Sequence, residues 1–388
     1  MTSSTASPDI ALPALSLVVL VGATGSGKST FAAQHFGRFE VVSSDHCRAL
    51  VSDDEADQAA SSAAFEVLHL IVEKRLAAGR LTAVDATNVT PRARQRLVEL
   101  AKQHNVAVVA IVLDVPEAVC VSRDAARRGR SHGAEVVRSH RQQLTKSRRG
   151  LRSEGFREVH MLHSVDEVDA VRIQREKLPN DHREYTGPFD VIGDIHGCRS
   201  ELESLLGALG YAISRDDNGN PVNASHPDGR CVVFVGDLVD RGPDSAGVLR
   251  LAMGMVTAGN ALAVPGNHEN KLLRALRDNS VRTGHGLAET LHQLDVTGEE
   301  FRDEVREFCD ELPPHLVLDG GNLVIAHAGL PEKYHGRCSP RVRSFALYGD
   351  PTRETDEHGF PVRREWTQDY QGQATSRMDT PRYVRLNG

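Results

Sequence analysis

The sequence predicts an α/β chain made of two successive units, each built around a sheet of parallel strands. Apolar runs of strand length alternate with helix-compatible stretches along the chain, as in doubly wound α/β folds. Several of these runs end directly in a cluster of polar residues. The length of 388 residues fits two domains, and 40% hydrophobic and 26% charged residues are the proportions of an ordinary globular protein.

The first unit is expected over residues 13–171, after a small, polar tail at 1–12 that we expect to be disordered. A helix is predicted to begin at Lys28, directly after the first strand and a glycine-rich loop. The repetition of strand and helix predicts a parallel sheet with helices on both faces. Its strands are predicted at 15–21, 39–42, 81–84 and 106–113, and further helices at 56–78 and 91–104.

A charged, turn-rich stretch at 172–188 has no apolar periodicity and is predicted to be a linker. The second unit then covers residues 189–388, with strands predicted at 189–192, 232–235, 261–264 and 323–326. Each of these strands runs into a polar cluster. Open α/β sheets carry their sites at the carboxyl ends of the strands, so the chemistry of this unit is expected there.

The glycine-rich loop from Gly22 to Thr30 follows a buried strand and precedes a helix, which is the context of a P-loop. Such a loop wraps its N–H groups around the phosphates of a nucleoside triphosphate, so ATP with Mg²⁺ is the expected ligand. Lys28 is expected to reach the β- and γ-phosphates and Ser29 to bind Mg²⁺. The predicted nucleotide-binding residues are Gly22, Gly25, Gly27, Lys28, Ser29 and Thr30.

An acceptor site would distinguish a kinase from other P-loop proteins. Asp45 lies just beyond the strand at 39–42, where its carboxylate could take the proton of an attacking hydroxyl. The segment Ser43-Ser44-Asp45 is an equally good start for a helix, so Asp45 as an N-cap stays open. Asp85, after the next strand, could hold Mg²⁺ through water or contact the substrate phosphate.

Arginines are concentrated after the last predicted strand of the first unit. Residues 121–157 hold eleven arginines and lysines against three acids, although the whole chain has a net charge of −7. Arg123 and Arg127 are one helical turn apart, so they share a face and could stabilise the charge of a transferred phosphoryl group. Arg130 follows in the next turn. A polyanion clamp is the preferred interpretation, with a solvated surface helix as the alternative.

Four polar clusters of the second unit supply carboxylate, amide and imidazole ligands of the kind that Mn²⁺ and similar divalent ions bind. Two such ions can hold both the attacking and the leaving oxygen of a phosphate ester. We expect one ion on Asp194 and His196, Asp237 as a bridge, and a second ion on Asn267 and His327. The second unit is therefore predicted to be a metallophosphoesterase.

Three further residues complete that predicted site. His268 would protonate the leaving group, Asp240 would orient His268, and Arg241 would bind the phosphate. The six cysteines form no C-x-x-C pair, and the early apolar run is too short to span a bilayer. A cytoplasmic enzyme without a membrane partner is expected, and a homodimer stays open.

Together these segments resemble the kinase and phosphatase modules of bacterial polynucleotide kinase-phosphatase, the end-healing enzyme of RNA repair. The second half by itself resembles the calcineurin-like metallophosphoesterase superfamily, an α/β sandwich. The resemblance implies ATP-dependent phosphorylation of 5′-hydroxyl ends, with Asp45 as base and Arg48 on the acceptor phosphate. It also implies removal of 2′,3′-cyclic or 3′-phosphates, on RNA or on DNA. A ligase and an RNA 3′-end methyltransferase are the implied partners.

The chain departs from that pattern in two respects. It stops at Gly388 without the ligase module, so a truncated or two-module form is expected. Asp379 stands where the phosphatase pattern places a metal-binding histidine. Either Asp379 supplies an oxygen ligand in its place, or the closing strands are missing and the second metal is held poorly. The second is the preferred interpretation, and it predicts an incomplete carboxyl end and an impaired phosphatase. The alternatives are a P-loop kinase for small molecules fused to a metallophosphoesterase, and an ATP-bound scaffold with a decayed phosphatase.

Overall fold

The computed structural model describes residues 9–127, 131–277, 281, 284, 286–355 and 361–364. Contacts divide these residues into two compact units, which are described separately. Unit 1 runs to Leu178 and also includes Arg337–Ser339, and unit 2 contains the rest. No helix in the described part of the chain is both long and apolar enough to cross a membrane.

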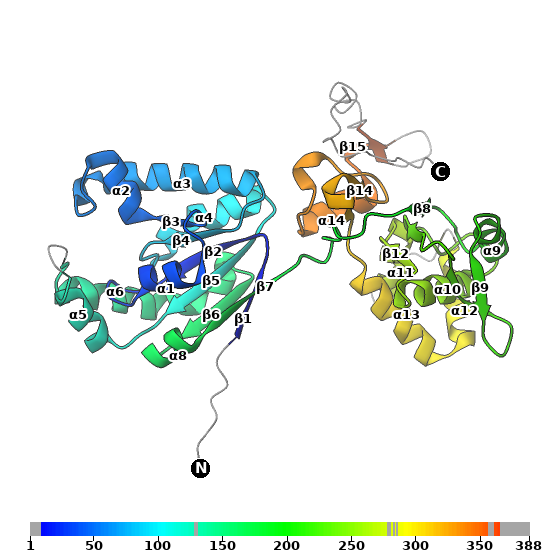
Figure 1. Cartoon of the computed structure of the whole chain (residues 1–388), viewed down its shortest axis with the longest axis horizontal. Helices are drawn as coiled ribbons and strands as arrows, with labels where there is room; N and C mark the ends of the chain where they lie inside the picture. Colours follow the sequence, from blue (N-terminus) through cyan, green and yellow to red (C-terminus); the bar gives the residue numbers. More distant parts are fainter. Residues whose placement is uncertain are drawn as a thin grey trace, which may run out of the picture. The chain divides into compact units, whose positions relative to one another are not determined.

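Unit 1 contains a five-stranded sheet in the order β3-β4-β2-β5-β6, and every neighbouring pair in it is parallel (Figure 1). Its strands are β2 (Ser16–Val21), β3 (Val41–Ser43), β4 (Thr82–Asp85), β5 (Ala107–Leu113) and β6 (Glu158–Leu162). Its helices are α1 (Lys28–His35), α2 (Ser44–Ser52), α3 (Ser61–Ala77), α4 (Pro91–Gln103), α5 (Glu117–Ala125), α6 (Ala134–Ser147), α7 (Leu151–Glu154) and α8 (Val165–Ala170), with single 3₁₀ turns at Gln58–Ala60 and Arg148–Gly150.

Helices cover both faces of this sheet. Successive side chains of a strand point to opposite faces, and β2 is buried along its whole length. Leu17 and Val19 pack into a core with α3 and α4, whereas Val18 and Leu20 pack into a second core with α1. The predicted parallel sheet with helices on both faces is therefore confirmed.

Two boundaries differ from the prediction. The predicted disordered tail contains β1 (Asp9–Pro13), and the predicted linker contains β7 (Arg172–Glu176), with which β1 pairs in parallel. The apolar side chains of Ile10 and Leu12 are buried in the unit 1 core, which holds this strand in place. The alternation is only two apolar residues long, so the polar residues around it hid the strand. Residues 1–8 lie outside the described residues.

Unit 2 has a three-stranded parallel sheet in the order β12-β11-β8, and three two-stranded sheets. Its strands are β8 (Phe189–Ile192), β9 (Ala212–Arg215), β10 (Pro221–Ser225), β11 (Cys231–Phe234), β12 (Ala261–Ala263), β13 (Leu316–Leu318), β14 (Leu323–Ile325), β15 (Pro351–Thr355) and β16 (Pro361–Arg363). Its helices are α9 (Arg199–Ala208), α10 (Ser245–Thr257), α11 (Asn267–Leu276), α12 (Leu287–Thr297), α13 (Glu299–Glu311) and α14 (Pro340–Tyr348), with 3₁₀ turns at Asp319–Gly321 and Glu332–Tyr334.

The parallel sheet of unit 2 lies between two cores. Val232 and Phe234 of β11 pack with α9 to α13 in the larger core, and Val233 packs on the opposite face with Leu316 and Ile325 of the β13–β14 pair. This layering confirms a mixed α/β fold for unit 2. The predicted strand at 323–326 is β14, but it pairs antiparallel with β13 and does not join the parallel sheet.

Candidate active sites

The polar loops of unit 2 meet at one carboxylate. Asp194 and His196 lie on the loop after β8, and Asp237 lies on the loop after β11. These strands are parallel neighbours, so their carboxyl ends lie at the same edge of the sheet. Asn267 begins α11, after β12, and His327 follows β14 of the second sheet. Two sheets thus contribute to one site.

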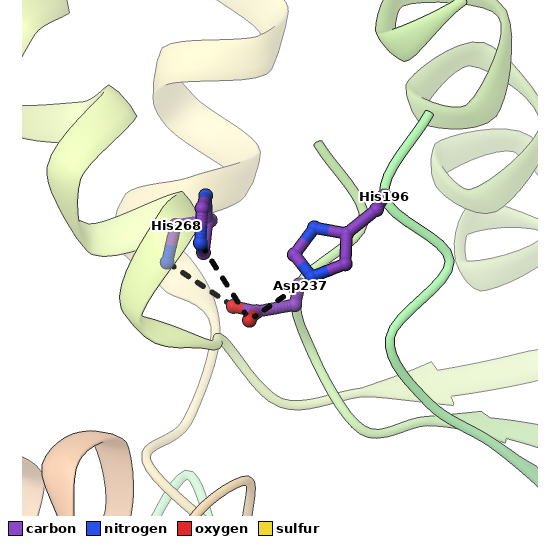
Figure 2. Close-up of side chains that lie close together, drawn as sticks. All are labelled: His196, Asp237 and His268. Atoms are coloured by element: carbon purple, nitrogen blue, oxygen red, sulfur yellow. Dashed lines mark hydrogen bonds and ion pairs between the residues drawn. The ribbon is translucent and has the colours of Figure 1, made fainter. Parts of the chain in front are cut away.

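The Oδ2 atom of Asp237 is close to three imidazoles. It lies 3.7 Å from Nε2 of His196, 3.6 Å from Nε2 of His327 and 3.9 Å from Nε2 of His268. Figure 2 shows the carboxylate of Asp237 between the rings of His196 and His268. Ligand atoms within 4.8 Å of one another form two groups, His196–Asp237–His268 and Asp194–Asp237–His327. Asp237 is common to both.

Hydrogen bonds fix which nitrogen of two of these rings faces the site. Nδ1 of His196 donates to the carbonyl of Val239 at 3.0 Å, and Nδ1 of His327 donates to the carbonyl of Val235 at 2.9 Å. Each ring therefore presents the lone pair of Nε2 to Asp237. Nε2 of His327 also lies 3.1 Å from Oδ1 of Asn267. Acceptor atoms that face one another this closely fit a shared divalent cation.

The loops that carry these ligands are strained. Five residues other than glycine adopt positive φ, a conformation that is uncommon for L-residues and concentrates at functional sites. They are Asp194 (53°), His196 (46°), Asp237 (51°), Asp240 (71°) and Arg241 (68°). Their backbone conformation therefore needs support from the surrounding structure.

The buried carboxylate of Glu269 supplies part of that support. It accepts hydrogen bonds from the backbone N–H groups of Gly266, Asp237 and Leu238 at 2.7 to 2.8 Å. Glu269 thereby joins the loop after β11 to the start of α11. Gly236 is needed beside it, because a Cβ there would lie 2.3 Å from the backbone nitrogen of Gly266. No role for Glu269 could be predicted from the sequence, although Glu269 directly follows His268.

His268 and Asp240 form a buried pair. Nδ1 of His268 lies 2.7 Å from Oδ2 of Asp240, and Asp240 is completely buried. Burial lowers the pKa of His268, but the hydrogen bond to Asp240 and the charge of Asp237 outweigh it and raise the pKa. The structure thus brings together the acid and the orienting residue predicted from the sequence. The side chain of Arg241 is exposed, and its role as a phosphate ligand stays a prediction.

The P-loop of unit 1 joins β2 to α1, which begins at Lys28. Nζ of Lys28 donates to the carbonyls of Gly22 and Ala23 at 2.8 and 2.9 Å. Burial lowers the pKa of Lys28 to about 8, although the nearby charge of Asp85 opposes this effect. Ser29 hydrogen-bonds Asp85, so the residue predicted to bind Mg²⁺ and the second acidic candidate are adjacent.

Glycines allow α5 to lie against the P-loop. Gly25 and Gly27 have φ of 80° and 98°, and a Cβ on Gly25 would lie 2.1 Å from the carbonyl oxygen of Cys120. A Cβ on Gly27 would lie 3.2 Å from Nη1 of Arg123. The guanidinium of Arg123 therefore lies at the loop, and its role in phosphoryl transfer stays a prediction. Thr30, also predicted to bind nucleotide, is exposed in the first turn of α1.

Asp45 and Arg48 are paired on α2. Nη1 of Arg48 lies 3.0 Å from Oδ1 of Asp45 and donates to the carbonyl of Glu55 at 2.7 Å. Asp45 and Arg127 both act electrostatically on Lys28, which places both side chains near the P-loop. The N-cap of α2 is Ser43, whose side chain accepts from the N–H of His46, so Asp45 does not have that structural role.

Two candidates remain outside this description. Arg130 of the predicted polyanion clamp and Asp379, expected in place of a histidine ligand, lie outside the described residues. The predicted incomplete carboxyl end also falls there.

Comparison with known proteins follows the division into two units. A family model described as calcineurin-like phosphoesterase matches residues 187–380, half of the chain. The chain belongs to the calcineurin-like phosphoesterase family. A model described as an AAA domain matches residues 17–151. The chain is therefore a fusion of a P-loop, kinase-like unit with a phosphoesterase.

Curated bacterial relatives match the phosphoesterase half. Bis(5′-nucleosyl)-tetraphosphatase PrpE of Halalkalibacterium halodurans is 45% identical over 188 residues, which are 47% of this chain and 74% of that protein. PrpE of Bacillus subtilis is 43% identical over 48% of this chain and 75% of its own length. PrpE of Geobacillus thermodenitrificans is 41% identical over 50% and 81%.

Membership in the calcineurin-like phosphoesterase family implies divalent metal ions, and the P-loop unit implies a bound nucleotide. The donor set around Asp237 fits such ions on its own chemistry, since carboxylate, amide and imidazole donors converge there. Resemblance to polynucleotide kinase-phosphatase is thus borne out at the level of the two units. These matches concern the family of each unit and not the processing of nucleic-acid ends.

Proposed function

We propose that this calcineurin-like phosphoesterase is a two-site enzyme that processes the ends of nucleic acids. The P-loop unit would transfer the terminal phosphoryl group of ATP to a 5′-hydroxyl, with Mg²⁺. The phosphoesterase unit would remove a 3′-phosphate or open and remove a 2′,3′-cyclic phosphate, on RNA or on DNA. The observation that carries the proposal is that Asp237 joins two groups of metal-ligand type in unit 2, while Lys28, Arg123 and Asp45 lie at the P-loop of unit 1.

For the kinase half, Asp45 accepts the proton of the attacking hydroxyl. The hydroxyl oxygen then bonds to the γ-phosphorus, and the bond to the β-phosphate oxygen breaks with its electron pair on ADP. Lys28, Arg123 and Arg127 supply positive charge beside the P-loop, where negative charge has to be balanced. Arg48 is paired with Asp45 in the structure. In this scheme Arg48 leaves that pair and binds the acceptor phosphate.

For the hydrolase half, Asp237 is shared by two ligand sets, with Asp194, His196, Asn267 and His327 around it. Divalent ions such as Mn²⁺, when bound there, polarise the phosphate and activate water. His268 gives the Nε2 proton to the leaving oxygen, and Asp240 holds the ring by Nδ1. Asp194, Asp237 and His327 form one of these groups among the described residues, and the effect of Asp379 on the hydrolase stays a prediction.

The basic block supports a polyanionic substrate, although part of it serves the fold. Arg141 and Arg148 pair with the buried carboxylate of Asp114, and Arg138 pairs with Glu117 at 3.2 Å. These pairs join α6 and the 3₁₀ turn after it to the segment between β5 and α5 and to α5 itself. Arg123 and Arg127 on the preceding segment are the guanidinium groups that we assign to the nucleotide and the acceptor end.

The acceptor assignment is tested by Asp45→Asn. This variant keeps the size of the side chain but cannot accept the proton, so labelling of a 5′-hydroxyl RNA oligonucleotide from γ-labelled ATP should fall by about 10² to 10⁴-fold. The exposed Asp169→Asn variant on α8 should label as the parent does. Unchanged labelling by Asp45→Asn would refute the proposed base. Faster labelling of small alcohols than of the oligonucleotide would favour a small-molecule kinase.

A second candidate for the hydrolase half is cleavage of bis(5′-nucleosyl) tetraphosphates, because the relatives that match this half at 41 to 45% identity carry that name. Hydrolysis of a 3′-phosphate RNA oligonucleotide, a cyclic-phosphate oligonucleotide and diadenosine tetraphosphate should be compared with added Mn²⁺. We expect higher kcat/KM for the oligonucleotides. A preference of more than about tenfold for the tetraphosphate would assign the site to that reaction.

A further inference from the structure

A buried hydroxyl contacts the side of Asp240 that faces away from His268. Oδ2 of Asp240 accepts a hydrogen bond from Nδ1 of His268, whereas Oδ1 of Asp240 lies 2.7 Å from Oγ1 of Thr290. Thr290 belongs to the first turn of α12 and is 1% exposed. It is 50 residues from Asp240 in the sequence and belongs to none of the polar loops that mark the site.

A third residue closes this arrangement. Oγ of Ser245 accepts from the backbone N–H of Asp240 at 3.0 Å and lies 3.0 Å from Oγ1 of Thr290. An ionised carboxylate only accepts, so the single hydroxyl proton of Thr290 points to Asp240. The proton of Ser245 can then point to Thr290. Every polar atom of the set has a partner, and Asp240 is held from its backbone and from both carboxylate oxygens.

We propose that Thr290 is a positioning residue for proton transfer by His268, acting through Asp240. The proposal rests on the hydrolase half of the proposed function. Asp240 is completely buried, so without the Thr290 hydroxyl its Oδ1 atom would be an unpaired acceptor. The carboxylate could then rotate, and the ring of His268, which it orients, would lose its fixed direction.

The affected step can be written in full. The oxygen of water bonds to phosphorus, and the ester P–O bond breaks with its electron pair on the leaving oxygen. That oxygen takes the Nε2 proton of His268, and the proton released by water passes to the solvent. A leaving group that is stable as an anion needs little of this proton transfer, whereas a basic leaving group depends on it.

The test therefore compares two esters within each protein. Thr290→Val keeps the branched shape and removes the hydroxyl, and Thr290→Ser keeps the hydroxyl. Turnover of phenyl phosphate, which has a basic leaving group, should fall about tenfold in Thr290→Val. Turnover of p-nitrophenyl phosphate should fall less than about threefold, because its leaving group needs less help. Thr290→Ser should restore phenyl phosphate turnover to near that of the parent.

The ratio of the two turnovers does not depend on the fraction of folded enzyme, so partial unfolding of a variant cannot imitate the effect. Thr297→Val on the same helix removes an exposed hydroxyl that bonds only to the carbonyl of Gln293, and it should leave the ratio unchanged. Equal losses on both esters in Thr290→Val would refute the role of Thr290 while leaving hydrolysis intact. A parent that hydrolyses neither these esters nor a 3′-phosphate or cyclic-phosphate oligonucleotide would refute the proposed hydrolysis itself.

Discussion

Asp237→Asn should lower phosphoester hydrolysis by at least about 10²-fold, since even the outer partners of metal ligands contribute 10 to 100-fold. Asp237 is the one residue shared by both ligand groups, and three imidazole nitrogens lie within 3.9 Å of its Oδ2 atom. An amide keeps the shape of the side chain but removes its charge. The expected measurement is kcat for 3′-phosphate release with saturating Mn²⁺, together with a titration of Mn²⁺ binding.

The matched control is Asp228→Asn, because the side chain of Asp228 is 85% exposed on a loop of the same unit. It should retain parent activity. Phosphorylation of 5′-hydroxyl ends by Asp237→Asn should also be unchanged, since the P-loop belongs to the other unit. Full hydrolysis with undiminished Mn²⁺ binding in Asp237→Asn would show that the ions bind elsewhere.

Lys28→Ala should lower transfer from ATP by about 10² to 10³-fold, the usual cost of losing one preorganised charge from a reacting site. Lys28 is buried at the start of α1, and its Nζ is held by two carbonyls of the P-loop. Loss of the ammonium group removes the positive charge nearest the loop. Labelling of 5′-hydroxyl RNA and binding of a fluorescent ATP analogue would measure the effect.

Lys102→Ala provides the comparison, because Lys102 is exposed in the last turn of α4. This variant should phosphorylate RNA as the parent does. Hydrolysis of 3′-phosphate ends should be the same in both lysine variants. Phosphorylation that survives Lys28→Ala would mean that the P-loop does not carry the transfer.

Much of the fold could be predicted because strong signals agree with one another. The apolar run at β2, the glycine loop and the helix that starts at Lys28 are local in the sequence, and each supports the others. β6 (Glu158–Leu162) and the β1–β7 pair could not be predicted, because these strands are short and their few apolar residues stand among charged and polar ones. These strands form because they pair with segments that are distant in the sequence.

The candidate sites show the same limit. Ligands at the ends of parallel strands, such as Asp237, could be placed from the sequence alone. His327 was expected in the same series, but it comes from an antiparallel strand of the second sheet. Glu269 and Thr290 could not be assigned roles, because each acts on another segment through buried hydrogen bonds that no local pattern records.

The three hydrogen bonds of Glu269 join the loop after β11 to the start of α11 through protein atoms alone. The strained geometry of the ligands is therefore preorganised, and binding free energy from the ions is not spent on ordering the backbone. We therefore expect unit 2 to keep its fold when its ions are removed, and its activity to return when divalent metal is supplied again.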